Sequence, residues 1–246
     1  MKAIRLAILA TLPLFLSYTT SCSQKKQPAE STADTSVYGR MTATRDGIGK
    51  TYLGREIAHV MGFGGASWLE RDERQEEENT ALAISKLPIS GNSVVADIGA
   101  GTGYYTFRIA PRVPQGKVYA VDVQDESVTY LRKKAQELGL SNVEVVKGTS
   151  QSPNLPENSV DLAIMVDVYH ELEYPHEMLQ ALRKSLKPDG RILLLEYRAE
   201  DPSIPIKELH KLSVVQATKE MKANGFKLVQ RGDFLPIQHF LVYEKE

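Results

Sequence analysis

Residues 94–103 have the sequence VVADIGAGTG, an apolar run that leads directly into three closely spaced glycines. The apolar run predicts a buried strand. The glycines predict a loop where a ligand approaches the backbone too closely for a Cβ atom. A dinucleotide site also has glycines after its first strand, but it needs a third glycine three positions after the second. Counted from Gly99 and Gly101, that position holds Tyr104, which argues against a nicotinamide dinucleotide.

Strands and helices are expected to alternate from this stretch onward. We expect strands at 94–98, 117–122, 143–147, 160–166 and 191–196, with helices at 104–112, 126–138 and 175–186. Such alternation predicts a doubly wound, mostly parallel α/β sheet with helices on both faces. A further helix begins at Ser213, with Gln216 in capping-box spacing, and ends at Gly225. Two last strands, 226–234 and 239–245, would form a C-terminal antiparallel hairpin.

An N-terminal helical extension is expected ahead of the sheet. Residues 51–61 place Leu53, Ile57, Ala58 and Met61 on one side of a helix, and residues 75–86 predict a second helix that opens with three glutamates. We therefore divide the folded part into a helical cap, residues 38–92, and a main domain, residues 93–246.

The bulk composition is that of an ordinary globular protein. The chain has 246 residues, of which 42% are hydrophobic and 25% charged, and its formal net charge is −1. This length suits one α/β domain with extra segments at the ends. The balanced charge predicts no nucleic-acid partner, because such a surface needs an excess of basic residues.

The first residues have the pattern of an export signal. Lys2 and Arg5 precede an apolar stretch, residues 6–16, and small polar residues lead to Cys22, the only cysteine. Residues 1–21 are thus expected to be a signal peptide, and residues 22–37 a solvated tether. Cys22 resembles the lipidated cysteine of bacterial lipoproteins, although Thr19 stands where leucine is usual. The alternative is an ordinary signal that ends near a cysteine.

These features carry expectations about location and metals. A lipid on Cys22 would anchor an exported protein on the periplasmic side of a bacterial membrane, and this lipid would be its only membrane contact. A single cysteine excludes a disulfide framework and a cysteine metal site within this sequence, and no metal site is predicted.

The pattern acid-x-Gly-x-Gly-x-Gly, from Asp97 to Gly103, resembles motif I of the class I S-adenosylmethionine-dependent methyltransferases. Asp122 lies 19 residues after Gly103, at the end of the next predicted strand. It matches the acid that holds the donor's two ribose hydroxyls in this family. Residues 167–171, DVYHE, and 186–190, LKPDG, resemble the ubiquinone-methylase-like branch (methyltransferase type 11).

The resemblance implies a seven-stranded Rossmann-like sheet, S-adenosylmethionine as cofactor and S-adenosylhomocysteine as product. It assigns the donor to Asp97, Gly99, Gly101, Gly103, Tyr104, Asp122, Thr149 and Asp167. Thr149 departs from the family pattern, in which an aspartate usually contacts the adenine amino group. Tyr104 either flanks the donor's methionine arm or packs its helix against the sheet.

Methyl transfer from a sulfonium is an in-line displacement, so the protein mainly aligns the reactants and excludes water. A base is needed only when the acceptor carries a proton. His170 is the candidate base and Glu171 would orient it or bind substrate; a purely structural role for His170 is the alternative. The candidates for binding a polar small-molecule substrate are Arg71, Arg74, Glu196, Arg198, His210, Lys211 and His239.

Two functions follow from these residues. The first is methyl transfer to a small molecule or an envelope component. The second is a non-catalytic lipoprotein that keeps the methyltransferase fold and binds S-adenosylmethionine or another ligand. Gly99, Gly101, Gly103 and Asp122 favour the first, because together they make a complete donor site.

Overall fold

A computed structural model of the chain describes residues 37–246. Its centre is a seven-stranded sheet in the order β6-β5-β4-β7-β8-β10-β9. The parallel strands are β4 (Val94–Ile98), β5 (Lys117–Asp122), β6 (Val143–Lys147), β7 (Val160–Val166) and β8 (Leu186–Tyr197). The hairpin of β9 (Phe226–Gly232) and β10 (Gln238–Lys245) joins β8 antiparallel. The predicted fold class is confirmed.

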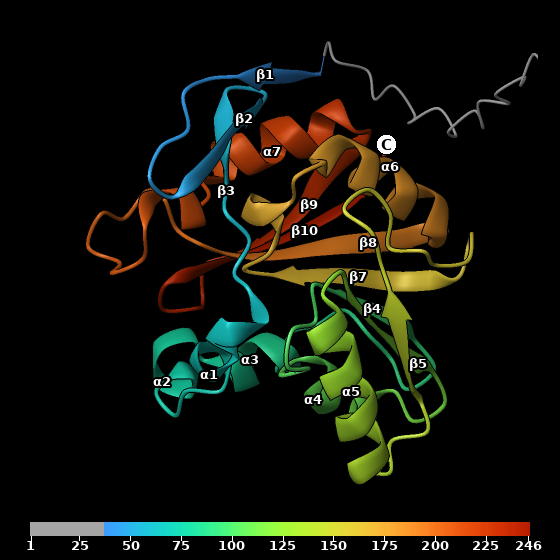
Figure 1. Ribbon diagram of the computed structural model, residues 1–246. Helices are drawn as coiled ribbons and strands as arrows, with labels where there is room; N and C mark the ends of the chain where they lie inside the picture. Colours follow the sequence, from blue (N-terminus) through green and yellow to red (C-terminus); the bar gives the residue numbers. More distant parts are fainter. Residues whose placement is uncertain (1–36) are drawn as a thin grey trace, which may run out of the picture. The chain divides into compact units, whose positions relative to one another are not determined.

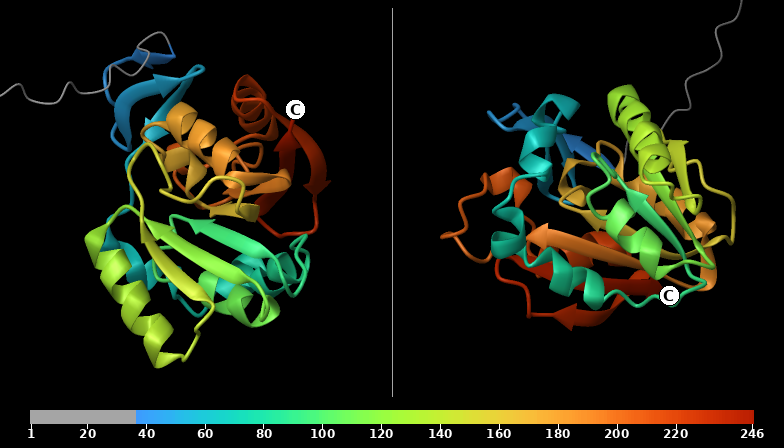
Figure 2. Two further views of the ribbon diagram at one scale, coloured as in Figure 1. Left: turned by 90° about the vertical axis from the view of Figure 1, so that its right-hand side faces the viewer. Right: turned by 90° about the horizontal axis from the view of Figure 1, so that it is seen from below.

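Helices cover both faces of the sheet (Figure 1). One face carries α3 (Thr80–Ser85), α4 (Thr106–Ile109) and α5 (Asp125–Glu137), and the other carries α6 (Pro175–Ser185) and α7 (Val214–Ala223). Successive residues of β7 alternate between the two cores: Leu162 and Ile164 pack on the first face, Ala163 and Met165 on the second. Figure 2 shows the same two layers from other sides. Strands buried on both faces explain the unbroken apolar runs of the sequence.

The expected helix at residues 51–61 is wrong. This part of the chain forms β2 (Gly47–Tyr52) and β3 (Arg55–Ala58), which pair with β1 (Tyr38–Arg40) in a small antiparallel sheet. Leu53 and Gly54 both have positive φ, 47° and 94°, so they make the two-residue turn that favours a hairpin. The helical spacing of apolar residues runs across this turn and has no structural meaning.

Helices do follow this small sheet, as η1 (Phe63–Gly65), α1 (Ala66–Leu69), α2 (Arg74–Glu78) and α3. The single helix expected at 75–86 is divided at Asn79, whose φ is 52°. Asn79 ends α2, and its side chain caps α3 by accepting a hydrogen bond from the Leu82 amide at 3.4 Å. The extension is therefore a small sheet followed by short helices.

The other helices and strands begin and end closer to their predicted positions. The helix expected at 104–112 is α4 followed by η2 (Ala110–Arg112), and β8 begins five residues earlier than expected. The capping box is confirmed at its first bond, because the Ser213 hydroxyl accepts from the Gln216 amide at 3.1 Å. Gly225, with φ 77°, follows the end of α7 as expected.

The predicted signal peptide, nearly all of the tether and Cys22 lie outside the described residues. Within residues 37–246, each helix is too short or too polar to cross a bilayer.

Candidate active site

The strand order places a crevice at the carboxyl edge of the sheet. β4 is flanked by β5 and β7, so the chain winds in opposite directions from β4. Loops that leave neighbouring strands toward opposite faces open a ligand site between them. The glycine loop follows β4, Asp122 ends β5, and Asp167 follows β7. The fold thus brings three separately predicted motifs to one edge.

The glycine loop has a backbone that other residues adopt with difficulty. Gly99, Gly101 and Gly103 have φ values of 71°, 56° and 79°. A Cβ at Gly99 would lie 2.7 Å from the Val168 side chain, and one at Gly101 would lie 2.8 Å from Leu69. Gly99 and Gly101 line a first cavity, which we call the donor cavity. Gly103 packs beneath the loop instead.

Asp122 gives the donor cavity its polar anchor. The side chain is 4% exposed; one carboxylate oxygen accepts from the Gly101 amide at 2.9 Å and the other from the Gln124 amide at 2.8 Å. No residue in the described part of the chain forms an ion pair with it. Each oxygen keeps a further lone pair. The carboxylate therefore fits two neighbouring hydroxyl groups, as a ribose presents them.

Besides Gly103, two further residues expected at the donor do not line this cavity. Asp97 is buried in β4, where its carboxylate accepts from the Thr106 hydroxyl at 2.6 Å. Burial raises the pKa of Asp97 to about 6. Tyr104 packs between the guanidinium groups of Arg74 and Arg108, 4.4 and 3.6 Å from its ring centre. Asp97 and Tyr104 therefore make their contacts within the protein, whereas Thr149 lines the donor cavity.

A second cavity of about 520 Å³ adjoins the first, and we call it the acceptor cavity. Both cavities are lined by Val60, Met61, Leu69, Asp167 and Glu171. A ligand in one would therefore meet a ligand in the other across these shared residues.

Asp167 stands at the junction in a strained conformation, with φ 53°. One carboxyl oxygen accepts from the Gln238 amide at 2.7 Å, and the other is buried without a partner among the described residues. Burial, followed by the charges of Glu78 and Glu196, raises the pKa of Asp167 well above its usual range. A buried polar oxygen without a protein partner marks a position for a polar group of a ligand.

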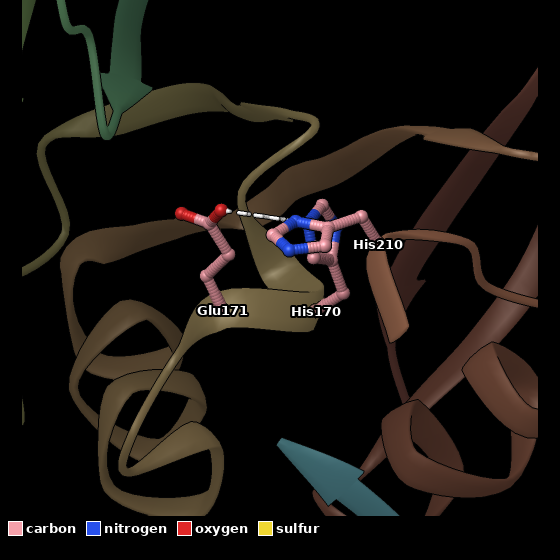
Figure 3. A group of neighbouring side chains, drawn as sticks. All are labelled: His170, Glu171 and His210. Carbon is pink, nitrogen blue, oxygen red and sulfur yellow. Dashed lines mark hydrogen bonds and ion pairs between the residues drawn. The ribbon is translucent and has the colours of Figure 1, made fainter. Parts of the chain in front are cut away.

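His170 lies on the floor of the acceptor cavity, in η3 (Tyr169–Glu171). Its Nδ1 contacts the Glu196 carboxylate at 2.6 Å, and its Nε2 lies 3.1 Å from Nδ1 of His210. His210 comes from η4 (Glu208–His210). Figure 3 shows His170, Glu171 and His210 gathered at one point. Two candidates from distant parts of the sequence therefore meet.

Burial and the neighbouring charges shift the pKa values of His170 and Glu171 in opposite directions. Burial by itself would lower the pKa of His170, but the carboxylates of Glu196 and Glu171 raise it to about 10. Burial would raise the pKa of Glu171, but its contacts with His170 and His210 lower it to about 2. The contacts between these groups thus favour the carboxylate form of Glu171 and strengthen the basicity of the His170 imidazole.

The N-terminal sheet fixes η3 in place. Arg55 of β3 donates to both carboxylate oxygens of Glu220 at 2.8 Å and to the His170 carbonyl at 3.0 Å. The Tyr169 amide donates to Glu196 at 2.8 Å. The segment that was wrongly expected to be helical thus positions the catalytic candidate.

Arg71 and Arg74, two of the substrate candidates, line the acceptor cavity, but their charges are already paired. Glu78, which is fully buried, lies 2.7 Å from the Arg71 guanidinium and 2.8 Å from that of Arg74. The Tyr197 hydroxyl also donates to Glu78, at 2.8 Å. This cluster forms a rigid wall.

The structure does not bring the remaining substrate candidates to either cavity. Glu196 is fully buried behind His170. Arg198 donates to the carbonyls of Leu235 and Pro236, Lys211 pairs with Glu208, and His239 pairs with Glu200. Each of these side chains is engaged by at least one partner within the protein, which the sequence pattern does not reveal.

Sequence reasoning missed several lining residues from the extension. Asp46, His59 and Glu78 all line the acceptor cavity. The spacing of Arg74 and Glu78, four residues apart, was a usable sign of an ion pair on a helix. Nothing in the sequence around His59 indicates that it reaches the site.

A doubly wound sheet with a glycine loop and a buried acid at its switch point is the architecture of a nucleotide-type site. Tyr104 stands where the dinucleotide pattern needs a glycine. A family model described as a methyltransferase domain matches residues 89–239, more than half of the chain. The chain therefore belongs to the methyltransferase domain family.

Similar proteins and solved structures agree with this family assignment. An uncharacterized methyltransferase, YcgJ of Bacillus subtilis, is 33% identical over 135 residues, which cover 54% of this chain and 53% of the relative. The ubiquinone/menaquinone biosynthesis C-methyltransferase UbiE of Pasteurella multocida is 28% identical over 134 residues, covering 53% and 50%. The chain thus spans about half the length of these two relatives.

A solved S-adenosylmethionine-dependent methyltransferase from Aquifex aeolicus superposes with a TM-score of 0.70 at 25% identity, covering 75% of this chain and 98% of that one. The family resemblance inferred from motif I is confirmed, and the cofactor of this family is S-adenosylmethionine. Asp122 and the glycine loop fit that cofactor.

Proposed function

We propose that this protein transfers the methyl group of S-adenosylmethionine, bound in the donor cavity, to a small molecule or envelope component bound in the acceptor cavity. The observation that carries the proposal is the adjacency of the cavities across Asp167 and Glu171. One side holds the glycine loop and Asp122, and the other holds His170. An in-line displacement needs donor and nucleophile held in such adjoining positions.

Each donor residue has a role in this proposal. S-adenosylmethionine supplies a methyl group on a sulfonium. Asp122 binds the ribose hydroxyls, the absence of side chains at Gly99 and Gly101 lets the backbone approach the ligand, and Thr149 offers a hydroxyl in place of the family's adenine-binding acid. The segment from Val60 to Leu69 closes the donor cavity and excludes water.

On the acceptor side, His170 and Glu171 contact the nucleophile. Glu196 fixes the imidazole through Nδ1, so that Nε2 faces the cavity. An acceptor hydroxyl or ammonium gives its proton to Nε2 of His170 in the fraction of the protein in which that imidazole is neutral. Arg71 and Arg74 shape the opposite wall, with their charges neutralised by Glu78.

Calorimetry of the purified full chain with S-adenosylmethionine, S-adenosylhomocysteine and NAD tests the donor site. We expect the first two to bind and NAD not to bind. Failure of both S-adenosyl ligands would contradict the proposal. Release of S-adenosylhomocysteine is then measured against a panel of polar small molecules and an envelope extract. Donor binding without turnover on the whole panel would favour the non-catalytic binding function.

We also propose that the protein is exported and lipid-anchored through Cys22. The support is the order of basic, apolar and small residues before a single cysteine. The mature protein should begin at Cys22, carry acyl chains by mass spectrometry, and fractionate with membranes. Cys22→Ala should move it to the soluble fraction. An unmodified mature protein that begins elsewhere would contradict lipidation.

A further inference from the structure

His170, Glu171 and His210 form a compact cluster of groups that bind metals. His170 Nε2 lies 3.1 Å from His210 Nδ1, His210 Nδ1 lies 3.3 Å from Glu171 Oε1, and His170 Nε2 lies 3.8 Å from the same oxygen. One ligand atom from each side chain lies within 4.8 Å of the other two, and Figure 3 shows a carboxylate oxygen of Glu171 facing the imidazole of His210. His210 is 40 residues away from His170, so only the fold brings them together.

These separations match the coordination sphere of a small divalent ion. Nitrogen and oxygen ligands bound at about 2.0–2.1 Å and at angles of about 90–110° lie about 2.8–3.4 Å apart. Two of the three observed separations fall in this range, and the third exceeds it by a few tenths of an ångström. Two imidazoles and one carboxylate are the donor set of several catalytic zinc and non-haem iron sites.

The atoms of His170 and Glu171 that do not face the centre are already held. Nδ1 of His170 contacts the buried Glu196 carboxylate, which leaves Nε2 as the free ligand atom. Oε2 of Glu171 accepts from the Met61 amide at 3.1 Å, which leaves Oε1 free. Outer hydrogen bonds of this kind orient the ligands of metal sites and fix the histidine tautomer.

The cluster also opens in the direction that catalysis requires. All three residues line the acceptor cavity, while Glu196 closes the cluster from behind. A metal ion held by three protein ligands keeps at least one position for water or substrate. That position would face the cavity in which we place the acceptor.

We propose that His170, Glu171 and His210 bind one divalent transition-metal ion with an affinity for imidazole, of the Zn²⁺ class. The separations between the three side chains support the binding of the ion. Its role in the reaction rests on the proposed function and gives the acceptor a chemical class, namely a molecule with a hydroxyl or similar oxygen that coordinates the ion.

Methyl transfer at such an ion needs no reactant other than the donor, the acceptor and water. The coordinated hydroxyl loses its proton to water, because a divalent ion makes a bound hydroxyl more acidic. The oxygen then takes the methyl group, so an O–CH₃ bond forms as the S–CH₃ bond breaks. The electron pair of the broken bond stays on sulfur, and the sulfonium becomes the thioether S-adenosylhomocysteine. In this form His170 acts as a ligand and the ion activates the nucleophile.

The test uses the full chain, purified without a histidine tag, stripped with chelator and titrated with Zn²⁺ by calorimetry. We expect one equivalent to bind. Co²⁺ should bind at the same site with a visible absorption spectrum, whereas Ca²⁺ and Mg²⁺ should bind poorly because they prefer oxygen ligands. Metal content of the untreated protein is measured alongside.

Two variants and a control assign the ion to the cluster. His210→Ala and Glu171→Gln should each weaken Zn²⁺ binding by about 100-fold or more, since loss of even an outer hydrogen-bond partner costs about 10–100-fold. His176→Ala is the control, because His176 bonds to Asn224 and lines neither catalytic cavity. Far-UV circular dichroism and urea unfolding show whether each variant is folded.

The outcomes separate the metal site from the proposed function. Absence of Zn²⁺ binding, or equal binding by wild type and both cluster variants, overturns the metal site even if S-adenosylhomocysteine binds. Absence of S-adenosylhomocysteine binding contradicts the proposed function, while Zn²⁺ binding lost in His210→Ala would still support the metal site.

Discussion

The carboxylate of Glu196 contacts Nδ1 of His170 at 2.6 Å, and both side chains are almost completely buried. Glu196 ends β8 and His170 follows β7, two neighbouring parallel strands. The pair therefore depends on strand register, and it sets which imidazole nitrogen faces the acceptor cavity.

Glu196→Gln should lower turnover while donor binding is unchanged. The amide keeps the shape of the side chain but loses the charge of the hydrogen bond, which contributes about 1.5–3 kcal/mol. We expect kcat to fall by about 10–100-fold, measured by release of S-adenosylhomocysteine. Glu200→Gln is the matched control, because Glu200 contacts His239 at 2.8 Å away from both cavities. Equal kcat in both variants would contradict the positioning role.

Asp122→Asn should weaken S-adenosylhomocysteine binding, because the neutral amide cannot accept two charged hydrogen bonds from ribose hydroxyls. The expected loss is about 1.5–3 kcal/mol, or roughly 10–150-fold in Kd by calorimetry. Asp125→Asn is the control, since Asp125 is exposed at the start of α5. An unchanged Kd for Asp122→Asn would mean that the ribose lies elsewhere.

Glu78→Ala should strongly destabilise the protein. Glu78 is fully buried and pairs with Arg71 and Arg74, so its removal leaves the buried Arg74 guanidinium without a charged partner. Such a loss costs about 3–5 kcal/mol in unfolding free energy, measured in urea. The neighbouring Glu77→Ala should cost about 0–1 kcal/mol, because Glu77 is 44% exposed in its pair with Arg71. Similar losses for the two variants would argue against a buried cluster.

Asp97 should make stability depend on pH. Burial raises its pKa from the ordinary 3.8 to about 6 in the folded protein. Between these values the folded state binds a proton that the unfolded state has released. The unfolding free energy should therefore fall as pH rises from about 4 to about 6, by up to ~1.4 kcal/mol per pH unit from this group.

Asp97→Asn should remove this contribution, because the amide oxygen still accepts from Thr106 but does not titrate. Urea unfolding of wild type and variant at several pH values measures the difference. We expect the stability of Asp97→Asn relative to wild type to increase from pH 4 to pH 6 and then level off. A difference that is constant with pH would show that Asp97 keeps its ordinary pKa.

The segment from Val60 to Leu69 should open to admit the donor and close over it once the donor is bound. The volume of the donor cavity is about 120 Å³, below the ~300–1,000 Å³ of typical ligand pockets, and this segment forms its outer wall. Gln124 holds it by accepting from the Phe63 amide at 2.8 Å and donating to the Met61 carbonyl at 3.1 Å.

Exchange of the backbone amide hydrogens measures the opening of the segment from Val60 to Leu69. Saturating S-adenosylhomocysteine should slow exchange in residues 60–69, and Gln124→Ala should speed it in the free protein. Exchange in the centre of β7 serves as the internal control. Identical exchange in residues 60–69 with and without ligand would contradict the expected opening.

The main sheet and the donor loop were predictable because their signals are local. Residues 94–103 carry both the buried strand and the glycines, and Asp122 follows at the end of the next strand. A parallel sheet brings the ends of adjacent strands together, so sequence order largely determines that edge. The hairpin turn at Leu53–Gly54 was equally local, but the spacing of apolar residues around it suggested a helix.

The sequence by itself thus determined the fold class, the position of the glycine loop and the position of Asp122 at the end of the next strand. Only the tertiary structure decided which polar residues surround the acceptor. His170, His210, Glu196 and Glu78 come from separate segments, and each could equally have faced solvent. Their meeting depends on strand register and on the packing of the N-terminal extension, which are sums of many long-range contacts that no short sequence pattern records.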